Sequence, residues 1–122
     1  MTGLSSVGET TVLNALLSAA YVSLHTADPG NTGVNELAGN GYARQGPVAF
    51  TASGNNPTVD ANTAIVSYPS ATADWGTVTH FGLWSAATAG NFLGGQALTT
   101  SRLVLANDVA RFLANTLQIS AD

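Results

Sequence analysis

The two histidines are the side chains in this sequence that come closest to metal or acid–base chemistry. His25 precedes Asp28 by three residues, and His80 lies within an apolar run. One histidine with one aspartate is too small a ligand set, and the spacing fits neither a zinc pattern nor a calcium loop. We therefore expect His25 to form hydrogen bonds near the turn at Asp28. His80 is expected to be a buried neutral imidazole bonded to a backbone carbonyl, and no metal or cofactor is predicted.

Carboxylates could do chemistry only as pairs, which glycoside and aspartyl mechanisms require. Five acidic residues instead lie in or next to predicted turns, where such side chains bond the local backbone: Asp28, Glu36, Asp60, Asp74 and Asp108. No Gly-x-Ser-x-Gly elbow is present. Gly39-Asn-Gly41 begins like a dinucleotide loop, but Arg44 stands where the third glycine belongs. The sequence therefore predicts no catalytic residue and no enzyme.

Charge is scarce along the whole chain. Charged residues make up 8% of the 122 positions, with 3 Lys plus Arg against 7 Asp plus Glu and a formal net charge of −4. Ordinary soluble domains have about 25% charged residues. Lys and Glu are depleted at protein interfaces because burying them costs rotamer entropy and desolvation. We infer that much of the surface contacts other protein; the alternative is a stable β domain kept soluble by hydroxyls and amides.

The same composition argues against several other classes of protein. Three scattered arginines cannot form the basic stripe that nucleic-acid binding needs. There is no cysteine, which excludes a disulfide framework and thiol chemistry. The longest apolar-leaning stretch, residues 13–24, falls short of the roughly 18 apolar residues of a membrane helix. The N-terminus has no cationic region typical of a signal peptide. We expect neither nucleic acid nor membrane as a partner.

One helix is predicted within residues 1–20. Ser6 and Glu9 are spaced as a capping box. Apolar residues then follow at helical spacing at Leu13, Leu16, Leu17 and Ala20. After Ala20 the period changes to two, which indicates strands. The expected organisation is a single domain, with a helical segment at 1–20 followed by a β-sandwich at 21–122.

Short strand signals, separated by turns every 8 to 12 residues or so, fill the rest of the chain. They lie at 21–26, 42–45, 48–50, 64–68, 75–84, 92–98, 102–105, 109–113 and 116–120. Residues 75–84 have β-forming side chains on both faces, so this strand is predicted to be central. Gly46-Pro47 predicts a bulge or a sheet edge. Such spacing favours a mainly β fold, an antiparallel jelly-roll-like sandwich of about eight strands.

The candidate partner-binding residues lie on or near a long loop at 28–41, because loops of this length tend to be functional. Val34 and Leu37 are expected to pin the loop to the body. Arg44 could be an interface anchor paired with a carboxylate from this chain or the next, or an exposed arginine on a strand edge. Trp84 is expected in the core. The candidate interface residues are Asp28, Asn31, Val34, Leu37, Tyr42, Arg44 and Trp75.

Two segments resemble small structural proteins of tailed bacteriophages. They are residues 24–45, LHTADPGNTGVNELAGNGYARQ, and residues 75–84, WGTVTHFGLW, with Phe92-Leu-Gly-Gly95 after the second. Members of this family are often labelled tail fibre proteins. Similar small β-sandwich proteins act as cement or decoration proteins on HK97-type capsids, commonly as trimers. The resemblance implies a virion structural protein, and the family has no catalytic motif to transfer.

The length of the chain favours the capsid over the tail. A receptor-binding fibre is usually long and repetitive, whereas these 122 residues contain no repeat and no shaft. We therefore predict a non-enzymatic cement protein on the outer capsid surface, with the major capsid protein and its own copies, as a homotrimer, for partners. A tail fibre or tail-tip adaptor is the alternative. A carbohydrate-binding module would need an exposed aromatic platform, for which Tyr21, Tyr42 and Tyr68 are the candidates.

Overall fold

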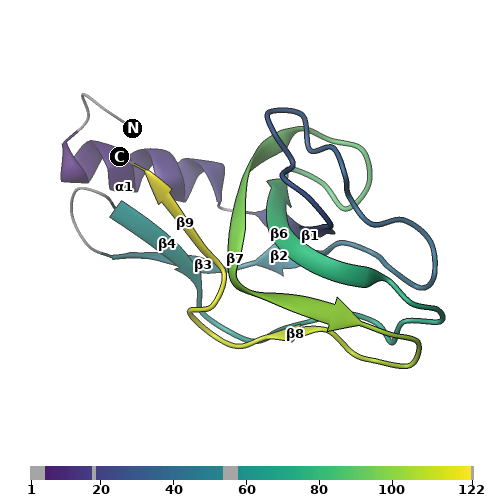
Figure 1. Cartoon of the computed structure of the whole chain (residues 1–122). Coiled ribbons are helices and arrows are strands. Elements are labelled where there is room, and N and C mark those ends of the chain that lie inside the picture. Colours follow the sequence, from purple (N-terminus) through teal and green to yellow (C-terminus); the bar gives the residue numbers. More distant parts are fainter. Residues whose placement is uncertain (1–4, 18, 54–57, 122) are drawn as a thin grey trace.

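The computed structural model describes residues 5–17, 19–53 and 58–121. Within these ranges the chain is mainly β, and every strand pairing is antiparallel (Figure 1). The elements are α1 (Ser6–Leu16), β1 (Ala20–His25), β2 (Gln45–Val48), β3 (Phe50–Ser53), β4 (Thr58–Asn62), β5 (Val66–Ser67), β6 (Gly76–Trp84), β7 (Phe92–Val104), β8 (Arg111–Phe112) and β9 (Gln118–Ala121).

The α1 helix begins with a side-chain cap. The backbone N–H of Gly8 donates to the Ser5 hydroxyl at 3.1 Å, which satisfies one of the free donors of the first turn. The predicted capping box of Ser6 and Glu9 rests on side chains outside the described part of the chain. Leu17, which follows the helix, is buried.

β6 is an inner strand of a four-stranded sheet whose order is β2-β1-β6-β7. It pairs with β1 in an unbroken register, from Tyr21 opposite Trp84 to His25 opposite His80. Its last four residues, 81–84, are all buried. The prediction of a central strand in this part of the sequence is therefore confirmed.

The other strands form two smaller sheets. β3, β4 and β9 make a three-stranded sheet, and β5 pairs with β8. α1 contacts β3 and β4 and runs along that three-stranded sheet in Figure 1. Sheets of four, three and two strands do not confirm the predicted jelly roll, which would have two packed sheets built from eight strands.

β2 differs from its prediction. The sequence suggested two strand pieces interrupted at Gly46-Pro47, but β2 runs through both residues, with a cis peptide bond between them. Proline, which has no N–H to donate, is accommodated because β2 is the outermost strand of its sheet. The pairing of β2 with β1 shifts register between Ala20 and Val22, so the predicted edge and irregularity are both present.

The main core gathers buried side chains from β1, β6 and β8. Val22, Leu24, Phe81 and Phe112 are at most 2% exposed. Tyr68 lies among them, and its hydroxyl donates to the carbonyl of Val22 at 2.8 Å, which ties the β5 region to the main sheet. In the described part of the chain, no helix has the length and apolar character needed to cross a membrane.

Candidate functional site

Arg44 connects two loops that are more than forty residues apart in the sequence. Its Nε and Nη2 donate to the two carboxylate oxygens of Glu36, both at 2.9 Å. Its Nη1 donates to the carbonyls of Ala86 at 3.1 Å and Ala89 at 2.8 Å. The guanidinium also lies 3.8 Å above the centre of the Trp84 ring. We call this arrangement of Glu36, Arg44 and the two carbonyls the Arg44 clasp.

The Arg44 clasp is mostly enclosed, with 10% of the Arg44 side chain and 18% of the Glu36 side chain exposed. Bidentate pairing matches the planar guanidinium to the carboxylate and makes the contact directional. The structure excludes an exposed arginine on a strand edge, and the pairing with a carboxylate that the other alternative requires is present. The carboxylate partner of Arg44 belongs to the same chain.

Tyr42 completes the carboxylate's surroundings. Its hydroxyl donates to Glu36 Oε2 at 2.6 Å and accepts from the N–H of Leu24 at 3.1 Å. Burial raises the pKa of Glu36, but the hydrogen bonds from Arg44 and Tyr42 outweigh burial, so the net shift is downward. Burial, together with the bond to Glu36, raises the pKa of Tyr42 far above its ordinary value. Both groups therefore keep the protonation states that these hydrogen bonds need at neutral pH.

A second polar network lies beneath the same loop. Trp84 Nε1 donates to the Ser23 hydroxyl at 2.9 Å, and that hydroxyl is 2.7 Å from His25 Nε2. His25 Nδ1 is 2.8 Å from the carbonyl of Val34. A carbonyl can only accept, so Nδ1 carries the hydrogen and Nε2 accepts from Ser23. Burial lowers the pKa of His25, which keeps the ring neutral.

Ser23 and His25 have no exposed surface. Gly82 closes the site, because a Cβ at this position would lie 2.6 Å from Ser23 Oγ and 2.8 Å from His25 Nε2. A hydroxyl beside an imidazole is the pattern of an activated nucleophile, but solvent does not reach this pair. Its role is to tie β1, Trp84 and the loop together. The prediction that His25 bonds near the Asp28 turn did not anticipate Ser23 as a partner.

The prediction for His80 was wrong. This histidine is half-buried rather than buried, and its Nδ1 lies 2.8 Å from the hydroxyl of Thr79 rather than bonding a backbone carbonyl. His80 of β6 is paired with His25 of β1 in the sheet. Within the described ranges, however, no three His, Asp or Glu side chains are grouped so that they could hold a metal ion.

The predicted interface residues divide into two groups. Asp28, Asn31 and Val34 are exposed on the loop, with Val34 at 52%. The Val34 side chain therefore does not pin the loop as predicted, although its carbonyl does so through His25. The other four face the body. Leu37 packs against the core, Tyr42 and Arg44 bond Glu36, and Trp75 donates from Nε1 to the Asn40 carbonyl at 2.8 Å.

The aromatic residues also face inward. Tyr42 and Tyr68 are stacked with ring centres 6.1 Å apart, and Trp75 lies edge-on to Tyr42 at 5.7 Å. Tyr68 is only 3% exposed. Tyr42 and Tyr68 therefore cannot form the exposed platform that a carbohydrate-binding module would need.

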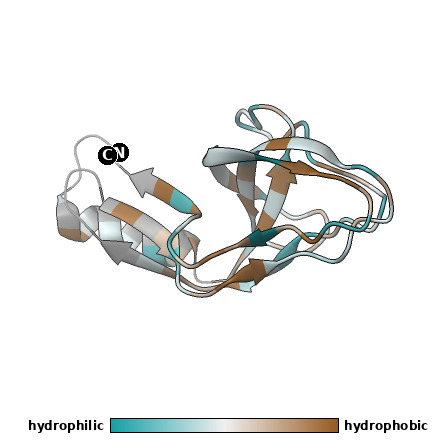
Figure 2. Cartoon of the chain, turned by 60° about the horizontal axis from the view of Figure 1, so that its bottom comes forward, coloured by the Kyte–Doolittle hydropathy of each residue, from teal (hydrophilic) through white to brown (hydrophobic). Residues whose placement is uncertain are grey.

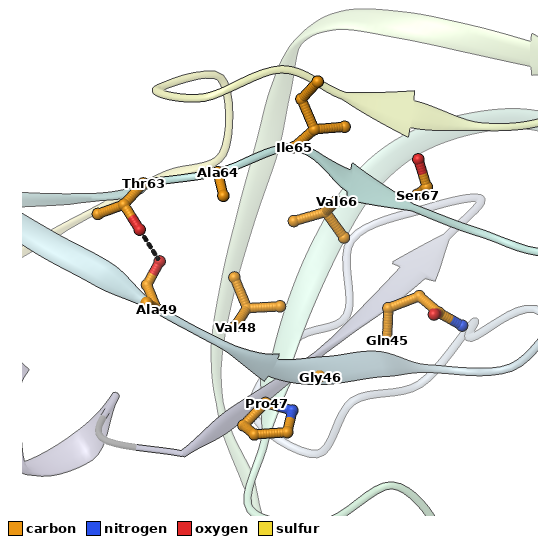
Figure 3. A pocket seen from close by; sticks show the side chains of 10 residues that line it. All are labelled: Gln45, Gly46, Pro47, Val48, Ala49, Thr63, Ala64, Ile65, Val66 and Ser67. Carbon is orange, nitrogen blue, oxygen red and sulfur yellow. Dashed lines mark hydrogen bonds between the residues drawn. The ribbon is translucent and has the colours of Figure 1, made fainter.

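An open groove lies between β2 and the segment around β5, and Figure 3 shows the side chains that line it. Its volume is about 400 Å³, and its lining residues are 45–49 and 63–67. At one end the N–H and the hydroxyl of Thr63 reach the carbonyl of Ala49, at 3.0 and 3.4 Å. None of its lining residues is charged, so the groove brings no acid–base or metal-binding group to a ligand.

Sequence reasoning missed an exposed apolar surface near the end of β7 and around β8. Leu103, Leu105, Val109 and Leu113 are 44–62% exposed. The available signal was the alternation of residues 102–113, in which apolar side chains occupy both faces of short strands.

The fold and the two enclosed polar networks define a small, mainly β protein. A comparison with protein families identifies it further. The family model described as "Podophage GP4 fiber I protein gp80" matches residues 3–120, and the chain therefore belongs to this family of phage fibre proteins. A search of curated proteins found no match. The predicted resemblance to small phage virion proteins labelled as tail fibre proteins is confirmed, and the chain is a bacteriophage virion structural protein.

Proposed function

We propose that this protein is a non-enzymatic structural component of a podophage tail fibre. The observation that carries the proposal is the match of residues 3–120 to a fibre protein family. It favours the alternative prediction, a tail fibre or tail-tip protein, over the capsid cement role. The argument for a cement protein rested on chain length and the missing shaft, whereas the family description names a fibre.

The loop at residues 26–37 is suited to binding another virion protein because its backbone is held in place. Thr26 N–H donates to the Asn35 carbonyl at 3.2 Å, and Leu37 N–H donates to the Leu24 carbonyl at 3.0 Å. The Arg44 clasp and His25 add side-chain anchors. A loop that is already ordered loses little conformational entropy on binding. Its exposed Asp28, Asn31 and Val34 are the residues that we propose contact a neighbouring virion protein.

Self-association is part of the proposed function. Low charge makes the surface inexpensive to desolvate, and burying apolar area contributes about 25 cal/mol per Å² before the entropy of association is subtracted. We expect copies of this chain to pack together in the fibre. The major capsid protein, named as a partner in the cement prediction, is not required by this role.

Antibody labelling of intact virions tests the location. Gold-labelled antibodies raised against the purified protein should bind the tail region in electron micrographs. Antibodies against the major capsid protein serve as the control and should decorate the shell. Labelling of the shell by the antibody against this protein would contradict the fibre role and restore the cement prediction.

A further inference from the structure

The outward face formed by the end of β7, the strand β8 and the flank of β5 is unusually apolar. Along residues 103–105 and 109–113, buried and exposed side chains alternate, as expected when a strand has one face in the core. Val104, Ala110 and Phe112 point inward. The outward positions next to and along β8, together with Ile65, carry the side chains that we call the Arg111 face: Ile65, Leu105, Val109, Arg111 and Leu113.

One strand pairing and two contacts of Arg102 relate β8 to β5 and to the end of β7. β5 and β8 pair with Ser67 opposite Arg111, a register that sets Ile65 opposite Leu113. Arg102 of β7 donates to the carbonyl of Arg111. Its guanidinium also lies 4.7 Å from the centre of the Phe112 ring. β8 therefore runs beside the C-terminal end of β7, as Figure 1 shows. In Figure 2, where the chain is coloured by hydropathy, hydrophobic residues alternate with paler and hydrophilic ones along the strands.

The turn that leads into β8 brings the face together at its other end. The N–H of Asp108 donates to the carbonyl of Leu105 at 3.0 Å, and one Asp108 carboxylate oxygen accepts from the N–H of Leu105 at 2.9 Å. Leu105 and Val109 are therefore neighbours across this turn. On the outward side of this segment, Arg111 therefore lies between the apolar residues Val109 and Leu113.

Arg111 differs from the other two arginines. Arg44 is fully engaged with Glu36 and two carbonyls, and Arg102 bonds the Arg111 backbone. The Arg111 side chain is exposed, and in the part of the chain that the structure describes it makes no hydrogen bond or ion pair. An arginine surrounded by apolar residues is a frequent anchor of protein interfaces, because its planar guanidinium can pair with a carboxylate once water is excluded.

The same face also supplies the opposite charge. Asp108 is exposed at the turn that leads into β8, three positions before Arg111 in the sequence, and Asp74 is exposed and accepts from the N–H of Ala106 at 2.9 Å. Each carboxylate is bonded to the backbone through one oxygen in these contacts, which leaves the other oxygen for a partner. A contact between two identical faces requires a surface that contains both members of each interacting pair. The exposed Arg111 and the exposed Asp108 give the segment from residue 108 to residue 113 one group of each sign.

We propose that the Arg111 face is a contact between two copies of this chain. Arg111 of each copy pairs with Asp108 of the other, and the surrounding leucines, valine and isoleucine exclude water. The proposal rests on the self-association included in the proposed function and names the surface responsible. The chain has 7 Asp plus Glu against 3 Lys plus Arg, so carboxylates are in excess. The number of ion pairs between copies is therefore limited by Arg111, the one unpaired arginine among the described residues.

Sedimentation velocity on the full chain tests the proposal. The wild-type protein should form a reversible oligomer. Leu113→Ser removes an outward apolar side chain two positions from Arg111 and should raise the dissociation constant about tenfold. Val34→Ser is the matched control, since Val34 is similarly exposed but lies on the loop, and it should leave the dissociation constant unchanged. A wild-type protein that stays monomeric at its highest soluble concentration would overturn the proposal.

A charge exchange separates this contact from any other association. Arg111→Asp and Asp108→Arg should each weaken self-association, because each places like charges opposite one another. A mixture of the two variants should associate again, since both ion pairs re-form in the mixed oligomer. Circular dichroism establishes that each variant is folded before it is compared. A mixture that associates no better than either variant alone contradicts the proposal, while the tail location found by antibody labelling would be unaffected by that result.

Discussion

Arg44 and Arg111 are chemically identical side chains used in opposite ways. Arg44 has its donors occupied by Glu36 and by the carbonyls of a second loop, and it stacks on Trp84. Arg111 stands exposed among apolar neighbours. In a chain with only 3 Lys plus Arg residues, the contrast indicates that these two arginines have different roles. The Arg44 clasp joins two loops within the chain, whereas the Arg111 face is exposed and can contact another copy.

Removing Arg44 should have the largest effect on stability. Arg44→Ala leaves the carboxylate of Glu36 without its ion pair, and breaking an enclosed pair of this kind costs about 2–3 kcal/mol. Arg111→Ala is the control and should change the free energy of unfolding by less than about 0.5 kcal/mol. Urea denaturation measures both. Equal losses for the two variants would erase the distinction between clasp and face.

Gly33 tests how tightly the loop is packed on Trp84. Its φ of +80° favours glycine, and a Cβ there would lie 2.4 Å from a Trp84 ring carbon. Gly33→Ala should therefore destabilise the protein by about 2 kcal/mol. Gly30→Ala is matched in backbone conformation, with φ of +61°, but has nothing within 4 Å. It should cost about 1 kcal/mol for backbone strain alone. If the two variants melted at the same temperature, the close packing of Gly33 would be unimportant.

His25 makes the clasp end sensitive to acid. Burial lowers its pKa in the folded state below the 6.5 of the unfolded chain. The unfolded state therefore takes up the proton first, so stability present above about pH 6.5 is lost as the pH falls through the folded-state pKa. The slope should be at most about 1.4 kcal/mol per pH unit.

The His25→Gln variant isolates this effect. When the pH falls from about 7 to about 5, its free energy of unfolding should change less than that of the wild-type protein. The variant retains His80 and Glu36, the titratable groups that influence His25. The lowered pKa of Glu36 confines its own loss of stability to pH values below about 4.5, outside this window. An unchanged pH dependence in the variant would show that His25 does not contribute.

Tyr68 should give the smallest of these effects. It lies under β8, on the inner side of the Arg111 face, and its hydroxyl donates to Val22. Tyr68→Phe leaves that carbonyl without this donor and should cost about 1 kcal/mol. Thermal unfolding followed by circular dichroism would measure it. No change in unfolding temperature would mean that the hydrogen bond contributes nothing to joining the β5 region to the main sheet.

The sequence predicted those elements whose structure depends on residues that are close together in the chain. The apolar and β-forming residues on both faces of 75–84 predicted a central strand, and Gly46-Pro47 predicted a sheet edge; both are present. The sequence could not predict how the strands divide among three sheets, because that depends on long-range pairing. The jelly-roll prediction failed to gain support for this reason.

That the candidate residues bind a partner stays a prediction, and the structure gives only their placement. Asp28, Asn31 and Val34 are exposed as a binding loop requires, but Tyr42, Arg44 and Trp75 are engaged within the molecule. Nothing in the spacing of Glu36 and Arg44 reveals that the loop brings them together. The Arg111 face was missed because its contiguity depends on the register of β5 with β8 and on the contact of Arg102 with β8, neither of which is encoded by local pattern.

Electron cryo-microscopy of the intact virion tests the central claim most directly. We predict that density for this chain lies in the tail fibre, with the Arg44 clasp closed and the Arg111 face covered by another copy. Density for the chain on the capsid shell, or in the fibre with Arg111 facing solvent, would contradict the account, the first result refuting the fibre role and the second the proposed contact.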